Sequence, residues 1–272
     1  MSGPTKPRLG VATEYPRHYS PELLVAIPRA EGRGGQALEQ PLYGVDIWTA
    51  YELSWLEPSG KPRVAIAEMV VPADSRHIVE SKSLKLYLNS LNREVFADTN
   101  QLAATLERDL SRAFGGKVRV TLYTLAEYGE KGIGVPEGES LDELAVSCDR
   151  YTPDPQLLAV ADESPVSERL YTDLFKTNCP VTGQPDWATV LIDYRGPAMD
   201  RTGLLRYLVS FRDHQDFHEN CVERLFADIL ARCRPASLTV SARYTRRGGL
   251  DINPWRSTEP DAAPRWRRLA RQ

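Results

Sequence analysis

The sequence predicts an α+β protein with antiparallel sheets, and the main reason is a divergent internal repeat. Tyr87-Leu88-Asn89-Ser90-Leu91 is similar to Tyr207-Leu208-Val209-Ser210-Phe211, which begins 120 residues further on. The alternating, strand-like runs Val118–Thr121 and Leu238–Ser241 keep the same separation. Two pairs of matching segments at one separation indicate a duplicated structural unit.

Each half begins with strand-like runs and continues with amphipathic helices. The β-rich runs are Val45–Leu53 and Arg63–Val71 in the first half, and Trp187–Tyr194 in the second. The apolar helical stripes are Leu84, Tyr87, Leu88, Leu91 and Val95; then Leu102, Leu106, Leu110 and Ala113; and, in the second half, Val222–Cys233. The expected unit is strand, strand, helix, helix, strand, used twice, each an antiparallel sheet with two helices packed on one face.

A stretch rich in Asp, Glu, Pro and Ser, from about residue 135 to 168, is expected to connect the two halves. We therefore divide the chain into an N-terminal module, residues 1–140, and a C-terminal module, residues 141–272. A chain of 272 residues with 42% apolar content is long enough for one large core or two modest ones.

Charge and hydropathy exclude several classes of protein. The formal net charge of -3 and the pI near 5.9 argue against a nonspecific nucleic-acid binder, and we interpret the basic cluster Arg265–Arg268 as solvated. The N-terminus is polar and Pro-rich, and the longest apolar run, Val64–Val71, is interrupted by Glu68. We therefore expect no secretion signal, no membrane span and a cytoplasmic location.

The four cysteines show no C-x-x-C pairing and are expected to be reduced. Cys233 continues the apolar stripe of its helix and should lie in the core, whereas Cys148 has no neighbouring base and is assigned no role. Cys179 lies in a loop bracketed by prolines and a glycine, where it is either a small packed hydrophobe or a reactive thiol. Asp186 follows a Thr-Gly-Gln-Pro turn that can bring a proton-transfer group near that thiol.

The polar residues Glu80 to Ser83 lead into the first helical stripe and predict a capped helix start. Glu80, Ser81 and Lys82 place a carboxylate, a hydroxyl and an ammonium at successive positions of that helix entry. Such an entry can hold a polar heterocycle and an anionic cofactor.

The eight residues Glu80-Ser81-Lys82-Ser83-Leu84-Lys85-Leu86-Tyr87 match at every position the signature motif of the 7-cyano-7-deazaguanine reductases. Thr177–Trp187 looks like the catalytic loop of that family. Further agreement comes from Leu205–Phe211, Phe217–Glu219 and Arg243–Arg256. Over most of residues 40 to 256, the chain thus resembles the long, two-module form of this family.

The resemblance implies a fold and a reaction. The modules would be tunnelling folds, as in GTP cyclohydrolase I, which pair edge to edge into barrels with active sites at the interfaces; the two-module form is usually a homodimer. The reaction would be the NADPH-dependent, four-electron reduction of the nitrile of 7-cyano-7-deazaguanine to 7-aminomethyl-7-deazaguanine, in tRNA queuosine biosynthesis.

The resemblance also assigns roles to individual residues. Cys179 would form a covalent thioimide with the nitrile and Asp186 would donate the proton, which requires an acid that is buried or lies beside a negative charge. The substrate-binding residues would be Val79, Glu80, Ser81, Phe217, His218 and Glu219. Glu219 would pair with the guanine-like N–H groups, Phe217 would stack on the ring, and His218 would position the nitrile. The NADPH-binding residues would be Ser81, Lys82, Arg247 and Gly248.

No G-x-G-x-x-G motif follows a strand, so the sequence excludes a Rossmann-type NADPH site. Arg247 and Gly248 lie in an Arg-Arg-Gly-Gly segment that offers guanidinium groups beside a backbone with little side-chain bulk. That combination suits a 2'-phosphate or a pyrophosphate.

Two other functions are compatible with the pattern. His214, His218 and Cys221 would share one face of a continuous helix and bind zinc, as in a zinc-dependent purine- or pterin-type hydrolase of the GTP cyclohydrolase I-like fold. Against this, residues 213–217 look like a helix junction, and we predict no metal site. The second alternative is a non-enzymatic purine-binding or assembly module, which the intact Cys179 and Asp186 disfavour.

Overall fold

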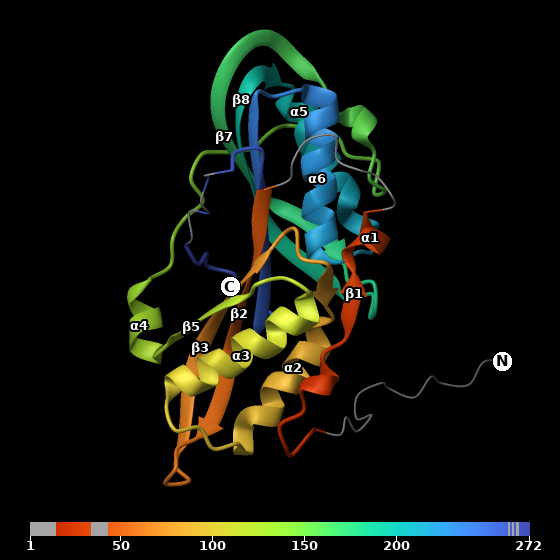
Figure 1. The fold of residues 1–272 in the computed structure, drawn as a ribbon. Coiled ribbons are helices and arrows are strands. Elements are labelled where there is room, and N and C mark those ends of the chain that lie inside the picture. Colours follow the sequence, from red (N-terminus) through yellow and green to blue (C-terminus); the bar gives the residue numbers. More distant parts are fainter. Residues whose placement is uncertain (1–14, 34–42, 261, 263, 265–266) are drawn as a thin grey trace, which may run out of the picture.

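The computed structural model describes residues 15–33, 43–260, 262, 264 and 267–272. Its main feature is a sheet of eight strands in the order β5-β3-β2-β10-β9-β8-β7-β6 (Figure 1). All neighbours in this sheet are antiparallel except β6 and β7. The strands are β2 (Tyr43–Leu56), β3 (Pro62–Pro72), β5 (Arg119–Tyr123), β6 (Glu139–Ser140), β7 (Val160–Asn178), β8 (Pro185–Met199), β9 (Ser237–Tyr244) and β10 (Leu250–Ser257).

Four longer helices lie on one side of the strands in Figure 1, and the short helix α4 (Leu125–Glu130) lies on the other. The four are α2 (Ser81–Ser90), α3 (Thr99–Phe114), α5 (Arg201–Val209) and α6 (His218–Cys233). The predicted order is confirmed, because β2-β3-α2-α3-β5 is followed by β7-β8-α5-α6-β9. Short 3-10 helices lie at Pro21–Leu23, Leu91–Arg93, Pro155–Leu157 and Ser210–Asp213.

A separate two-stranded sheet pairs β1 (Ala26–Pro28) with β4 (His77–Val79). The short helix α1 (Arg29–Gly32) follows β1 directly. This N-terminal segment runs from the lower pair of helices toward α6 in Figure 1.

The repeat extends to side-chain hydrogen bonds. Tyr87 on α2 donates its hydroxyl to Asp109 on α3, at 2.7 Å, and Tyr207 on α5 donates to Asp228 on α6, at 2.6 Å. The serine three residues after each tyrosine donates to the tyrosine's own carbonyl, at 2.6 Å in both halves. The two helix pairs are therefore joined by the same polar contact inside an apolar interface.

Each half has its own apolar core. One cluster packs α2 and α3 against β2 and β3; the other packs α5 and α6 against β7, β8 and β9. Strand alternation explains the packing, since Leu238, Val240, Ala242 and Tyr244 of β9 all face the second core. Cys233 lies in that core, as predicted.

Three details of the sequence analysis need comment. Val95 is 56% exposed, because α2 ends at Ser90 and the chain leaves the helix before that residue is reached. The predicted connector is too long, because β7 already begins at Val160. The division into modules at residue 140 stays a prediction, because one sheet runs through both halves without a break.

The sheet face opposite the four helices carries a cavity of about 680 Å³. It is lined by outward-facing side chains of β9, such as Thr239 and Ser241. Residues near the two ends of the connector between the halves, and residues of the C-terminal tail, complete the lining. Arg265 and Trp266 of the basic cluster lie outside the described residues. Arg267 is exposed, but Arg268 donates to the Gln272 carbonyl and its guanidinium lies 5.8 Å from the Tyr51 ring centroid.

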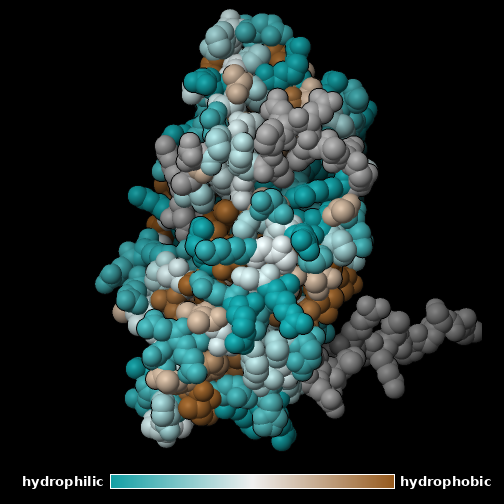
Figure 2. Space-filling model, in the orientation of Figure 1, coloured by the Kyte–Doolittle hydropathy of each residue, from teal (hydrophilic) through white to brown (hydrophobic). Residues whose placement is uncertain are grey.

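The surface in Figure 2 is mostly hydrophilic, with apolar side chains in small patches. Within the described parts of the chain, no helix is both long enough and apolar enough to cross a membrane.

The tyrosine–aspartate contact predicts a stability effect. We expect Tyr207→Phe to lower the free energy of unfolding by about 1.5 kcal/mol, because the substitution leaves Asp228 without its buried donor. Urea denaturation measures the change. Tyr151→Phe is the control, since Tyr151 is 43% exposed and its hydroxyl makes a long 3.3 Å contact; it should change stability by less than about 0.5 kcal/mol. Equal losses in the two variants would contradict the assignment.

Candidate active site

A pocket lies between the two halves of the chain and collects nearly all the predicted site residues. Its floor is made by Trp48 of β2 and Ile252 of β10, which are opposite each other in the strand pair that joins the halves. The lining residues are Trp48, Val79, Glu80, Ser81, Cys179, Pro180, Val181, Asp186, Asp216, Phe217, His218, Glu219, Arg247 and Ile252. Its volume is about 30 Å³, so a bicyclic base enters only if the surrounding side chains move apart.

The loop between β7 and β8 positions Cys179. Thr177 is paired with Asp186 across the hairpin, and the loop closes through two backbone hydrogen bonds of 2.9 Å, from Cys179 N–H to Gln184 and from Gly183 N–H to Cys179. Gly183 has φ +68°, a conformation that favours glycine. The turn thus brings Asp186 and the thiol to the same pocket, as the sequence analysis expected.

The surroundings of Cys179 favour its thiolate. Burial by itself raises the pKa of Cys179, but hydrogen bonds from Thr182, from backbone N–H groups of residues 181 and 182, and from Arg247 outweigh it, so that the pKa is lower than usual. A larger fraction of the thiol is then ionised at neutral pH, which is what a nucleophile requires.

Asp186 is buried, as expected of a proton donor, but its neighbours are basic rather than acidic. Arg247 Nε lies 2.9 Å from one carboxylate oxygen and His218 Nε2 lies 3.3 Å from the other. The His218 ring stacks on Tyr244, with centroids 3.7 Å apart and planes within 3°. Of the two alternative conditions expected of Asp186, burial is met, and the groups paired with its carboxylate are Arg247 and His218.

Glu80 is the N-cap of α2, which confirms the predicted helix start. Its two carboxylate oxygens accept hydrogen bonds from the backbone N–H groups of Lys82, at 2.9 Å, and Ser83, at 2.7 Å. These bonds fix the carboxylate beside the pocket. Each oxygen keeps a second lone pair with which to accept a ligand N–H group.

Glu219 lies in the first turn of α6 and is 2% exposed. Burial and the negative charge of Asp46 raise the pKa of Glu219 to about 8, while Arg29 and Arg256 act in the opposite direction. Its Oε1 has no hydrogen-bond partner among the described residues. Glu219 is thus a pocket carboxyl with spare acceptor capacity and an ionisation close to neutral pH.

The predicted cofactor residues are only partly brought together. Ser81 and Arg247 line the pocket, whereas Lys82 and Gly248 do not, and Lys82 is exposed on the first turn of α2. Gly248 has φ +56°, and a Cβ there would lie 2.8 Å from Lys85 Nζ. We call Lys82, Lys85 and Arg247 the basic rim: Lys85 reaches Gly248, next to Arg247, and Lys82 lies three residues before Lys85 on α2. Such cations have the chemistry that phosphate groups require.

Comparison with known proteins identifies the family. The model described as nitrile reductase, 7-cyano-7-deazaguanine-reductase N-term, matches residues 15–122, and the model described as QueF-like protein matches residues 185–263. A protein of Dechloromonas aromatica (strain RCB) is 55% identical over 97% of this chain and 94% of its own length. One of Azoarcus sp. (strain BH72) is 56% identical over 93% and 91%. Both are named NADPH-dependent 7-cyano-7-deazaguanine reductase.

The chain belongs to the 7-cyano-7-deazaguanine reductase family. Among solved structures, the apo form of an archaeosine synthase QueF-Like protein is 18% identical, with a TM-score of 0.31, and covers 37% of this chain and 97% of that chain. That similarity is too low to carry an argument about this fold.

Membership of this reductase family does not support the zinc hydrolase alternative. That alternative also required His214, His218 and Cys221 to lie on one continuous helix, which they do not. Residues 213–217 form the predicted junction: α6 begins at His218, so His214 is not on the same helix as His218 and Cys221. Across the described ranges, no group of three or more His, Cys, Asp or Glu side chains is arranged to hold a metal ion.

Several residues of this reductase pocket were missed by the sequence analysis. Trp48, Ile252 and Asp216 line it, and Lys85 borders it. Lys85 and Asp216 had a local signal, because they lie in or beside the family motifs. Ile252 also lies in such a motif, whereas Trp48 had no local signal, since only the pairing of β2 with β10 brings it beside Ile252.

The lowered pKa of Cys179 predicts its reactivity. The rate at which iodoacetamide alkylates Cys179 should increase with pH. The midpoint of this increase should lie below about 8.5, the pKa of an ordinary cysteine. In Arg247→Ala the midpoint should move up, because the guanidinium no longer stabilises the thiolate. Peptide mass spectrometry separates Cys179 from Cys148, which serves as an internal reference in each digest. An unchanged midpoint in the variant would exclude this role of Arg247.

Proposed function

We propose that this protein uses NADPH to reduce the nitrile of 7-cyano-7-deazaguanine to the primary amine of 7-aminomethyl-7-deazaguanine, in tRNA queuosine biosynthesis. The relatives named for this activity match nearly the whole chain. The observation that carries the proposal is the pocket itself: a thiol with a lowered pKa shares it with the buried Asp186–His218 pair and with two carboxyl groups suited to a purine-like edge.

The proposed chemistry begins at Cys179. Its sulfur adds to the nitrile carbon, one C–N π bond breaks, and the nitrogen takes a proton to give a neutral thioimide. Asp186, with His218 at 3.3 Å, is the proposed source of that proton. NADPH supplies hydride: two hydrides and two further protons convert the thioimide carbon to CH₂–NH₂ and release the thiol.

Substrate recognition is assigned to residues of both halves. The carboxylates of Glu80 and Glu219 accept the N–H donors of the guanine-like edge, and Phe217, at the N-cap of α6, stacks on the ring. His218 is held by Tyr244 and Asp186, so its imidazole is fixed beside the nitrile end. Val79 and Ser81 complete the wall.

The cofactor is assigned to the basic rim. Lys82, Lys85 and Arg247 are the cations, and Ser81 and the Gly248 backbone are the neutral donors beside them. Arg247 pairs with Asp186 and also donates to Gln184 at 2.7 Å, so it links the cofactor side of the pocket to the acid.

We further propose a cytoplasmic homodimer that acts on the free base and not on a nucleic acid. The net charge of -3 does not favour a polyanion. Strands β5 and β6 end the sheet and present edges to which a second copy could pair.

The covalent mechanism predicts that Cys179→Ala loses turnover while it still binds substrate, because the recognition groups lie elsewhere. Wild type mixed with the nitrile in the absence of NADPH should show a new thioimide absorbance band, and the variant should not. Cys148→Ala is the control and should keep both band and turnover. If Cys179→Ala retains more than about a hundredth of wild-type kcat, a loss below roughly 3 kcal/mol, the thioimide is not on the pathway.

Arg247 is predicted to read the 2'-phosphate. In Arg247→Ala the preference for NADPH over NADH should fall at least tenfold, since a charged hydrogen bond is worth about 1.5–3 kcal/mol and only NADPH offers that phosphate. Loss of the Arg247–Asp186 ion pair should lower turnover with NADPH and with NADH by the same factor. The ratio of the two kcat/KM values therefore isolates the contact with the 2'-phosphate. An unchanged ratio would assign Arg247 to the shared pyrophosphate or to the loop.

A further inference from the structure

The N-terminal arm, residues 25–33, contacts the two segments that carry the pocket carboxyl groups. Its first part holds the entry of α2. Ala26 of β1 pairs with Val79 of β4, Glu80 N–H donates to the Val25 carbonyl at 3.0 Å, and Val25 N–H donates to Ser83 Oγ at 3.0 Å. The arm therefore fixes the backbone from which Glu80 projects.

The second part of the arm packs on the first turns of α6. A Cβ on Gly32 would lie 2.0 Å from the Asn220 side-chain amide, so α1 packs directly against the first turn of α6. Arg33 donates to both carboxylate oxygens of Glu223, at 2.8 and 3.0 Å. Asn220 is the residue directly after Glu219.

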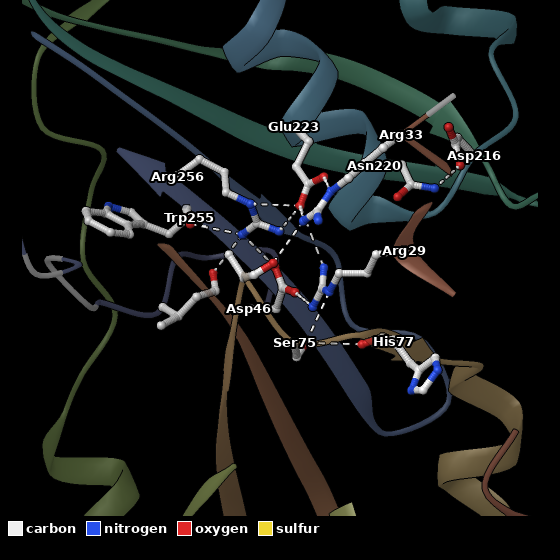
Figure 3. A network of polar contacts seen from close by, with 12 residues as sticks. Arg29, Arg33, Asp46, Ser75, His77, Asp216, Asn220, Glu223, Trp255 and Arg256 are labelled. Carbon is white, nitrogen blue, oxygen red and sulfur yellow. Dashed lines mark hydrogen bonds and ion pairs between the residues drawn. The ribbon is translucent and has the colours of Figure 1, made fainter. Parts of the chain in front are cut away.

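Between these contacts, Arg29 enters a buried ion cluster (Figure 3). Arg29 is 2% exposed; it donates to Asp46 at 2.5 Å and to Ser75 at 3.1 Å, and its Nη1 lies 3.7 Å from Glu223. Arg256 approaches Asp46 from another side, at 2.7 Å, and pairs with Glu223 at 2.8 Å. Both Asp46 and Arg256 are fully buried.

The charges of this cluster do not balance by themselves. Arg29, Arg33 and Arg256 contribute three positive charges, whereas Asp46 and Glu223 contribute two negative ones. Glu219, one helical turn before Glu223, is the third buried carboxyl that interacts with Asp46, Arg29 and Arg256. An ionised Glu219 therefore completes the charge balance.

We propose that Arg29 is a positioning residue for substrate binding: from the N-terminal arm it neutralises Asp46, so that the buried Glu219 can carry the negative charge that receives the substrate's N–H groups. This inference rests on the proposed function of Glu219. Arg29 lies outside the pocket lining, so it acts through Glu219 and does not touch the substrate.

The groups that face Glu219 fix the sign of the effect. Asp46 on β2 opposes its ionisation, whereas Arg29 on α1 and Arg256 on β10 favour it. Glu223 and His218 flank it on α6, and the Glu80 carboxylate and the Asp186–Arg247 pair share the same pocket. Loss of Arg29 therefore raises the pKa of Glu219 further, and loss of the Asp46 charge lowers it.

Substrate binding needs the ionised form, so the KM for the nitrile falls as pH rises through the pKa of Glu219. In Arg29→Gln we expect a KM at pH 7 raised at least about tenfold, equivalent to one pH unit, with kcat changed less than about threefold. The KM profile should move to higher pH. Asp46→Asn should move it to lower pH, an opposite shift that mere loss of packing cannot produce.

Arg33→Gln is the matched control, because it removes an ion pair with Glu223 from the same arm, and Arg33 is not among the groups whose charge acts on Glu219. It should lower the melting temperature and move the KM profile less than Arg29→Gln does. If Arg29→Gln behaves like Arg33→Gln, or if Arg29→Gln and Asp46→Asn shift the profile in the same direction, the inference is wrong.

A thermal measurement separates this inference from the proposed function. A carboxyl whose pKa is raised on folding makes the folded protein less stable as pH rises from the unfolded pKa, about 4.5 for Glu219, to the folded pKa. Glu219→Gln should abolish this pH-dependent loss of stability. Comparing wild type with Glu219→Gln gives the pH range over which ionisation of Glu219 lowers the melting temperature. Comparing Arg29→Gln with Arg29→Gln/Glu219→Gln gives the same range in the absence of Arg29. The second range should extend to higher pH than the first. If the two pH windows, meaning these two pH ranges, are identical, Arg29 does not act on Glu219, and the inference is wrong even if the protein is an active reductase. Shifted windows in a protein that does not reduce the nitrile overturn the function alone.

Discussion

The antiparallel pairing of β2 with β10 is the interaction on which the rest of this structure depends. It runs from Leu250 opposite Ala50 to Ser257 opposite Tyr43, and it joins two repeats that each have their own core into one sheet. Backbone hydrogen bonds set the register to a single residue. That register places Trp48 and Ile252 together under the pocket, and it brings a helix entry near residue 80 to face another near residue 218.

The same pair of strands, β2 and β10, contains several buried polar and charged side chains. Asp46 and Arg256 are fully buried along it, and Asp251 and Asn253 are nearly so. Taking charges out of water costs several kcal/mol per ion, and only close pairing with further hydrogen bonds offsets that cost. Every charge here has such partners: Asp46 contacts two guanidinium groups, and Arg256 contacts Asp46, Glu223 and two backbone carbonyls. The cluster is therefore better understood as a constraint on orientation than as a source of stability.

The pocket combines groups whose ionisation is set by this environment. Hydrogen bonds lower the pKa of Cys179, burial raises the pKa of Glu219, and Asp186 is enclosed by Arg247 and His218. The surroundings thus move the pKa values of Cys179 and Glu219 in opposite directions within one pocket. Cys179 and Asp186 lie on one hairpin and Glu219 in the first turn of α6, so regular structure sets the backbone positions of all three.

The duplicated unit, the apolar helical stripes and the family could be predicted from the sequence alone, because apolar periodicity and short motifs are local properties that survive divergence. The sequence also singled out Cys179, Asp186 and the two helix entries, which the structure brings to one pocket. It did not reveal β10, whose eight residues are all buried and include Asp251, Asn253, Pro254 and Arg256, so that neither alternation nor propensity marks a strand. Nor did it reveal the start of β7 in a polar stretch, the partners of Asp186, or the buried contacts of Arg29. Those depend on pairings between residues far apart in the chain, and only the folded sheet decides which of them meet.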